Sequence, residues 1–276
     1  KKKYFYVEKF EKEFAKFHNR KYGLMTPNCT TAIHLILHSL GIKKGHNVIN
    51  QDCTWVAAAA AVSYTGAKNN LVDIDEETWC LDYKKLKASI NKKTKAIIVS
   101  DIYGNMPYID KIINIANKFK IPVIEDSAEA LGSKYKQKKA GSFGIASTFS
   151  FHRTKTITTG EGGMLVTNNK KLFDLCKFYR DQGRNNKSSY IIDELGYKYM
   201  PFNLQAALGY SQFLKIKKIV GLKRSILREY KKCFKKMKDI QFNIDNKIFY
   251  NGCWATTIVI GRSYKIKSSK LMKKLS

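Results

Sequence analysis

Residues 95–126, KAIIVSDIYGNMPYIDKIINIANKFKIPVIED, carry the pattern that decides the fold. Two short apolar runs rich in β-branched residues, 95–100 and 121–125, lie on either side of residues 108–119, where apolar side chains recur at helical spacing. Near-continuous apolar strands separated by helices are typical of parallel sheets that are covered on both faces. The stretch therefore predicts an α/β fold with a mostly parallel central sheet flanked by helices.

The same alternation continues outward from this stretch. Further strand-like runs follow it at residues 146–151 and 164–167. Helical periodicity precedes it in three places, of which the last ends at Gly66, where a helix C-cap belongs; the three segments are residues 10–17, 30–40 and 55–64.

From about residue 215 the pattern changes to one long basic helix, 215–238. Strand candidates follow it at 240–244 and 254–260. We therefore expect a large domain over residues 1–214 and part of a smaller C-terminal domain over residues 215–276, in a chain that is truncated at both ends.

The net charge of +29 comes almost entirely from lysines that are scattered along the chain, whereas arginine, whose planar fork reads bases and phosphates, occurs seven times. We expect no nucleic-acid partner, but a basic surface that attracts a phosphorylated small substrate. The densest basic stretch is the predicted helix 215–238, and its lysines would lie in solvent if its apolar positions face the core; these are Ile216, Ile219, Val220, Ile226, Tyr230 and Phe234.

The six cysteines form no CxxC pair and no Cys/His metal spacing. No apolar run is long enough to span a bilayer, and no secretion signal is recognisable. Several thiols without a secretion signal are typical of a reducing compartment. We expect a cytoplasmic protein with no metal site and no membrane partner.

Most of the residues that could take part in catalysis or ligand binding lie between residues 123 and 168. Ligands of parallel sheets gather at the carboxyl ends of the strands, where Asp101 and Asp126 are expected. Lys155 follows the predicted strand 146–151 and precedes the turn TTGEGG, residues 158–163, whose glycines let something flat or bulky approach the backbone. Such a lysine can form an imine with an aldehyde cofactor, and a carboxylate can keep a pyridine nitrogen protonated. Spacing alone leaves open the simpler interpretation, a surface lysine and an ordinary strand-end aspartate.

Several separate segments resemble the DegT/DnrJ/EryC1/StrS family of pyridoxal-phosphate (PLP) sugar aminotransferases, and in particular the perosamine-synthase-like members that act at C4. They are EDSAEALGSKYKQKKAGSFG (125–144), FSFHRTKTITTGEGGM (149–164), PNCTTAIHLILHSLGIKKGHNVI (27–49), YTGAKNNLVDID (64–75), DIYGN (101–105) and LGYKYMPFNLQAALG (195–209). The resemblance covers nearly the whole chain. It implies an aspartate-aminotransferase-type PLP fold, fold type I, with pyridoxal 5'-phosphate as the cofactor.

The resemblance also assigns roles to single residues. Lys155 matches the family's Schiff-base lysine, and Asp126 matches the aspartate that pairs with the pyridinium nitrogen. Glu129 stands where many members have a glutamine that bonds the phenolic oxygen of the cofactor. The remaining matches are Trp55 for the aromatic residue that stacks on the ring, and Ser150, Cys29 and Thr30 for phosphate ligands.

Two positions depart from the family pattern. Cys29 replaces a glycine, which a positive φ at that position would disfavour. In GYKYMPFNLQ (196–205), Lys198 and Met200 occupy a region from which a residue of the partner subunit usually reaches the phosphate. Lys198 and Asn203 are alternative candidates for that contact.

The resemblance implies an enzyme that transfers an amino group from L-glutamate to a nucleotide-linked keto-sugar for polysaccharide biosynthesis, as a homodimer with shared active sites. TTGEGG is similar to C4-specific members, and Lys155 argues against the related sugar dehydratases, which have histidine at this position. The alternative hypothesis is a non-catalytic binding protein on the same scaffold.

Overall fold

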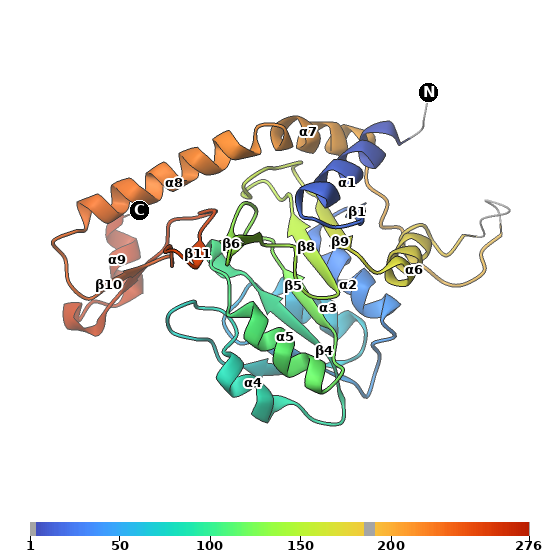
Figure 1. Ribbon diagram of the computed structural model, residues 1–276, viewed down its shortest axis with the longest axis horizontal. Helices are drawn as coiled ribbons and strands as arrows, with labels where there is room; N and C mark the ends of the chain where they lie inside the picture. Colours follow the sequence, from blue (N-terminus) through green and yellow to red (C-terminus); the bar gives the residue numbers. More distant parts are fainter. Residues whose placement is uncertain (1–3, 185–190, 276) are drawn as a thin grey trace.

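A seven-stranded sheet forms the centre of the computed structural model, which describes residues 4–184 and 191–275 (Figure 1). The strand order is β1-β9-β8-β5-β4-β2-β3. Strand β9 is antiparallel to both of its neighbours, and the other strands share one direction. The predicted mostly parallel sheet is confirmed. Its strands are β1 (Tyr22–Thr26), β2 (Asn47–Gln51), β3 (Lys68–Val72), β4 (Thr94–Ser100), β5 (Val123–Asp126), β8 (Ala146–Ser150) and β9 (Gly163–Thr167).

The central strands lie where the sequence predicted them. Strand β4 is buried at every position except Lys95, which is the burial expected of a strand covered on both faces. Its neighbour β5 is buried throughout and ends at Asp126. The carboxyl ends of β4 and β5 are therefore adjacent, since Ser100 is in register with Asp126.

One face of the sheet packs against α2 (Cys29–Ser39), α3 (Ala57–Tyr64) and α6 (Lys170–Arg180). Helix α2 is the centre of this layer, because residues 32–37 are all buried. Its N-terminus is capped by Asn28, whose side-chain oxygen accepts a hydrogen bond from the Thr31 N–H at 2.9 Å. Helix α3 ends before Gly66, which has a φ of +77° as the sequence predicted for a terminator.

The other face carries two groups of helices (Figure 1). Helices α4 (Tyr83–Ser89) and α5 (Ile109–Lys118) cover the β4 side. Helices α1 (Phe5–Phe17) and α7 (Asn203–Phe213), with the start of α8 (Ile216–Cys233), cover β1, β9 and β8. Phe10 and Phe14 of α1 are completely buried, and both rings contact Phe151. Together these two helical layers bury both faces of the sheet.

The C-terminal segment begins with α8, which forms the long upper arm in Figure 1. Ile216 and Val220 are buried as expected, but Ile226 and Tyr230 are exposed and Leu227 is buried instead. The predicted apolar face is therefore wrong at Ile226 and Tyr230, because only the first turns of α8 pack against the large core, whereas Phe234 is half-buried against Phe242.

The chain then returns to the sheet through short elements. Strands β10 (Ile240–Phe242) and β12 (Ile258–Ile260) pair with each other, and β11 (Phe249–Tyr250) pairs with β6 (Lys134–Tyr135), which in turn pairs with β7 (Lys138–Lys139). The remaining elements are η1 (Ile102–Gly104), η2 (Arg262–Tyr264) and α9 (Ser268–Leu275). This return brings residues 251–257 next to the carboxyl ends of the central strands, because the Asn251 side chain donates to the Asn105 side chain at 2.8 Å and the Trp254 Nε1 donates to the Thr154 carbonyl at 2.7 Å.

Candidate active site

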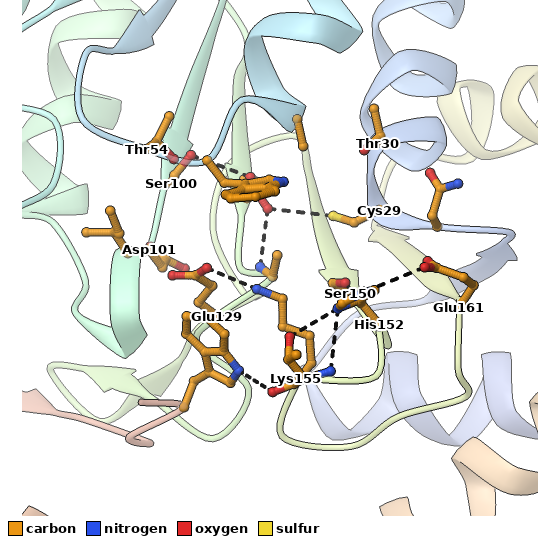
Figure 2. A pocket seen from close by; sticks show the side chains of 18 residues that line it. Cys29, Thr30, Thr54, Ser100, Asp101, Glu129, Ser150, His152, Lys155 and Glu161 are labelled. Atoms are coloured by element: carbon orange, nitrogen blue, oxygen red, sulfur yellow. Dashed lines mark hydrogen bonds and ion pairs between the residues drawn. The ribbon is translucent and has the colours of Figure 1, made fainter. Parts of the chain in front are cut away.

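A cavity of about 540 Å³ lies at the carboxyl ends of β4, β5 and β8 (Figure 2). This is the edge at which the sequence predicted ligand binding, and Asp101 and Asp126 both line the cavity. All seven predicted site residues contribute to its wall: Cys29, Thr30, Trp55, Asp126, Glu129, Ser150 and Lys155. These seven side chains are up to 126 positions apart in the sequence (29 to 155).

Asp126 presents a buried carboxylate to this cavity. Its closest partner is the Ala128 N–H at 3.2 Å, while the Ser100 hydroxyl and the Cys29 thiol lie at 3.5 and 3.7 Å. Burial raises the pKa of Asp126 and the charge of Glu129 adds to that effect, whereas the Ala128 N–H and Lys155 oppose it. A buried carboxylate with two long contacts retains acceptor capacity for a cationic N–H donor.

Lys155 and Glu129 form an ion pair at 3.0 Å, and only 14 and 15% of their side chains are exposed. Figure 2 shows the Lys155 amine pointing toward the Glu129 carboxylate. The second oxygen of Glu129 accepts a hydrogen bond from the Tyr103 N–H at 2.8 Å. The amine is therefore held inside the cavity wall by a carboxylate that is itself fixed to the backbone.

The N-terminus of α2 forms another side of the cavity through Asn28, Cys29 and Thr30. Cys29 is the first residue of the helix and is not among the residues with positive φ. The departure from glycine at this position therefore imposes no backbone strain, and the concern raised by the sequence does not apply.

The glycine-rich turn has a different use from the one expected. Gly160 has a φ of +79°, which fits a tight reversal. At Gly163, however, an added Cβ would lie 2.4 Å from the Asn28 carbonyl carbon. What approaches β9 at Gly163 is therefore the chain's own backbone at the start of α2, and this glycine sets the position of that helix N-terminus.

Ser150 and Trp55 both line the cavity. The Ser150 hydroxyl accepts a hydrogen bond from the His152 N–H at 3.2 Å. Trp55 precedes α3, and 73% of its surface is exposed. An exposed indole face at the edge of a cavity can stack on a planar ring.

The two candidates for a partner-subunit contact do not line the cavity in the described part of this chain. Lys198 makes an ion pair with Asp181 at 3.7 Å and its side chain is 63% exposed. The side-chain oxygen of Asn203 accepts from the N–H groups of Tyr6 and Val7 at the start of α1. Asn203 therefore already serves α1, whereas Lys198 is held only loosely.

The residues of the cavity wall that were not predicted from the sequence include four with polar or aromatic side chains near Lys155: His152, Thr154, Glu161 and Trp254. The His152 ring lies 3.0 Å from the Thr154 hydroxyl and 3.7 Å from Glu161. Trp254 arrives from the C-terminal segment, and its Nε1 donates to the Thr154 carbonyl at 2.7 Å. His152, Thr154 and Glu161 lie within the quoted motif, but no local pattern marks Trp254.

Other kinds of site were also sought in residues 4–184 and 191–275. No group of three or more His, Cys, Asp or Glu side chains there could hold a metal ion. No helix in that part of the chain has the length and apolar character needed to cross a membrane. The six cysteines are all free.

A mostly parallel sheet whose carboxyl ends present a lysine and a strand-end aspartate to one cavity defines a PLP enzyme of fold type I. The known structures agree: an aminotransferase from Psychrobacter cryohalolentis superposes with a TM-score of 0.84 at 26% identity, covering 90% of this chain and 68% of that one. The chain belongs to the DegT/DnrJ/EryC1/StrS aminotransferase family, whose sequence model matches residues 2–276.

Two relatives show which members of this family the chain is similar to. It is 40% identical to the GDP-perosamine synthase of Escherichia coli O157:H7, over 92% of this chain and 69% of the relative. It is 38% identical to the UDP-4-amino-4,6-dideoxy-N-acetyl-beta-L-altrosamine transaminase of Campylobacter jejuni, over 83% of this chain and 62% of the relative. The chain thus spans roughly two thirds of the length of these proteins. The family is PLP-dependent, and nothing in these comparisons favours the non-catalytic alternative.

Proposed function

We propose that this enzyme transfers an amino group from L-glutamate to C4 of a nucleotide-linked 4-keto-6-deoxy sugar, for the synthesis of a surface polysaccharide or other glycan. The observation that carries the proposal is a single cavity lined by both the Lys155 amine and the Asp126 carboxylate. The TTGEGG turn and the names of the two relatives support action at C4. The relatives use different nucleotides, so their names support the reaction class and not one nucleotide.

The residues around the cavity fit PLP. Bound PLP supplies an aldehyde that forms imines with amines and a ring that accepts electrons. Asp126 would hold the proton of the ring nitrogen, because a cationic N–H donor stabilises a buried carboxylate whose contacts to Ser100 and Cys29 are long. Lys155 would bind the aldehyde carbon and move a proton to and from the substrate carbon. Glu129 would share a proton with the phenolic oxygen.

The phosphate would lie at the start of α2. Because the Asn28 side chain caps the helix through Thr31, the N–H groups of Cys29 and Thr30 are left for an anion at the positive end of the helix dipole. The Ser150 hydroxyl lines the same cavity and can donate to a phosphate oxygen. Trp55 would cover one face of the ring.

A homodimer with shared active sites is part of the proposal. Large apolar side chains are exposed just before α3, at its end and at the start of α7, including Trp55 (73%), Tyr64 (64%), Phe202 (73%) and Leu204 (82%). Exposed apolar surface of this kind marks an interaction site. Lys198 would reach the phosphate of the partner's site, because Asn203 is already engaged with α1. We place the boundary between the large and small domains at 214/215, directly before α8.

The first experiment tests cofactor attachment. Purified protein is incubated with PLP, reduced with borohydride and digested, and the modified peptide is identified by mass spectrometry. We expect the phosphopyridoxyl group on Lys155, and no stable attachment in Lys155→Ala. Lys170→Ala is the matched control, because Lys170 is exposed and pairs with Asp174 on the surface. Attachment spread over surface lysines and unchanged by Lys155→Ala would overturn the proposal.

The second experiment tests the substrate. The PLP-loaded enzyme is given L-glutamate with GDP-, UDP- or dTDP-linked 4-keto-6-deoxy sugars, and the products are analysed by mass and NMR. We expect a 4-amino sugar and 2-oxoglutarate in equal amounts with at least one nucleotide. The corresponding 3-keto sugars are the control, and amination of those alone would refute action at C4.

A further inference from the structure

The Lys155 amine contacts Glu129 and one residue from the C-terminal segment of the chain, Trp254. Its Nζ lies 3.9 Å from the centroid of the Trp254 ring and 3.0 Å from the Glu129 carboxylate. An ammonium group above an indole face is attracted by the electron density of the ring. Trp254 therefore contacts the same amine that Glu129 pairs with, from a segment 99 residues later in the sequence (155 to 254).

Trp254 is itself held from three directions. Its Nε1 donates to the Thr154 carbonyl at 2.7 Å, and its own carbonyl accepts from Lys223 of α8 at 3.0 Å. Its ring is parallel to that of Tyr103, with an angle of 2° between the planes and 6.1 Å between the centroids. The indole is thus fixed before any ligand binds, and it cannot leave the amine without breaking a hydrogen bond to the residue that precedes Lys155.

Tyr103 connects Trp254 with Glu129. Its backbone N–H donates to Glu129 at 2.8 Å, and its carbonyl accepts from Asn243 at 2.9 Å. Asn243 is 1% exposed, and its side-chain oxygen accepts from the Thr257 N–H at 2.7 Å. The same C-terminal segment therefore fixes both the Trp254 ring and the backbone group that orients Glu129.

We propose that Trp254 is a positioning residue for Lys155: its ring face and its hydrogen bond to Thr154 hold the free amine inside the cavity beside Glu129. The inference rests on the proposed function only in that Lys155 is taken as the lysine that carries PLP. In a reaction in which this amine is released and recaptured in each cycle, a fixed resting place keeps it within reach of the cofactor. The role belongs to residues of the C-terminal segment, although the lysine belongs to the large domain.

The test uses cofactor-free protein, so that it does not depend on PLP binding. Acetic anhydride is applied in trace amounts, and the acetylation rate of Lys155 is measured by mass spectrometry relative to that of the exposed Lys170. In Trp254→Leu and Trp254→Met we expect this ratio to rise roughly 2- to 30-fold, which is the range that corresponds to the loss of one cation–π contact. Trp254→Phe keeps a ring face and should stay closer to the natural protein than either aliphatic variant.

The matched control is Tyr250→Leu. Tyr250 lies in the same segment and also packs its ring on a cation, Arg224 at 3.8 Å, but it does not line the cavity. We expect no change of the Lys155 ratio in Tyr250→Leu. An unchanged ratio in the aliphatic Trp254 variants, or an equal rise in Tyr250→Leu, would overturn the inference.

Trp254→Phe keeps the test decisive if an aliphatic variant fails to fold. A rise of the Lys155 acetylation ratio in Trp254→Phe above 30-fold, the upper limit predicted for the aliphatic variants, would also overturn the inference. The proposed function fails separately, if the natural protein shows no borohydride-trapped PLP on Lys155. Trp254→Leu should also lower the occupancy of Lys155 at limiting PLP, and Trp254→Phe should restore it.

Discussion

His18 provides a pH dependence of stability whose size follows from its surroundings. It is completely buried against the rings of Phe14 and Phe149. Its Nδ1 donates to the Ala140 carbonyl at 2.7 Å, and its Nε2 is buried with no partner in the described residues. Burial lowers the pKa of His18 from 6.5 to about 3, against a smaller opposing effect of the Ala140 carbonyl. The folded protein therefore holds this ring neutral.

The sign follows from proton binding. Between pH 6.5 and 3 the unfolded chain binds a proton at this ring and the folded protein does not, so the free energy of unfolding falls as the pH falls. The contribution of His18 is complete above pH 6.5 and declines by about 1.4 kcal/mol per pH unit below it. Lowering the pH from 7 to 5 should cost about 2 kcal/mol through this residue alone.

Urea unfolding at pH 7 and pH 5 measures this contribution when the natural protein is compared with His18→Asn. Asparagine can donate to the Ala140 carbonyl but does not titrate, so the difference between the two proteins cancels the buried carboxyl groups, whose raised pKa values act in the opposite direction. We expect His18→Asn to be less stable at pH 7, because it leaves a cavity. Between the two pH values, it should lose about 2 kcal/mol less than the natural protein. Parallel losses in both proteins would refute the assigned state of His18.

Three further predictions concern the site. Asp126→Asn should retain covalent PLP but lower kcat by about 10²-fold or more, measured as glutamate-dependent formation of the pyridoxamine form, because a neutral amide cannot hold the ring proton; an unchanged kcat would argue against the pairing. Gly163→Ala should destabilise the protein by about 1–3 kcal/mol in urea and weaken PLP binding, since its Cβ would meet the Asn28 backbone at 2.4 Å; full PLP affinity in this variant would mean that the start of α2 does not bind the phosphate. Cys29→Gly should bind PLP as well as the natural protein in fluorescence titrations, because the backbone N–H does the binding, while it loses about 0.5–1 kcal/mol of stability; a large loss of affinity would instead assign the thiol a direct role.

The central sheet was predictable because its inner strands are covered on both faces. Residues 96–99 of β4 are all apolar, so this run predicts the position of the strand to within a residue. The edge strand β3 has the sequence KNNLV and is mostly exposed or half-buried. Without a continuous apolar run it carries no strand signal, and its place in the sheet comes from parallel pairing with β2.

The site was predictable in part. Lys155 and Asp126 lie in segments whose order and spacing resemble a known family, and both line the cavity. Trp254 was not predictable, because its position depends on how the C-terminal segment docks through contacts such as the one from Asn243 to Tyr103. The reversed strand β9 was equally hidden, since an apolar run does not record its direction.

The order of the strands in the sheet has a consequence for how the chain is made. Strand β1 is synthesised before the other six strands of the described sheet, yet its partner there is β9, so this pairing cannot form until residues 163–167 have left the ribosome. Until then its apolar residues Leu24 and Met25, which end up buried, remain open to other contacts. Folding during synthesis therefore has to begin at β2, β3 and β4, and the edge formed by β1 is added late, at the cost in rate that long-range pairing imposes.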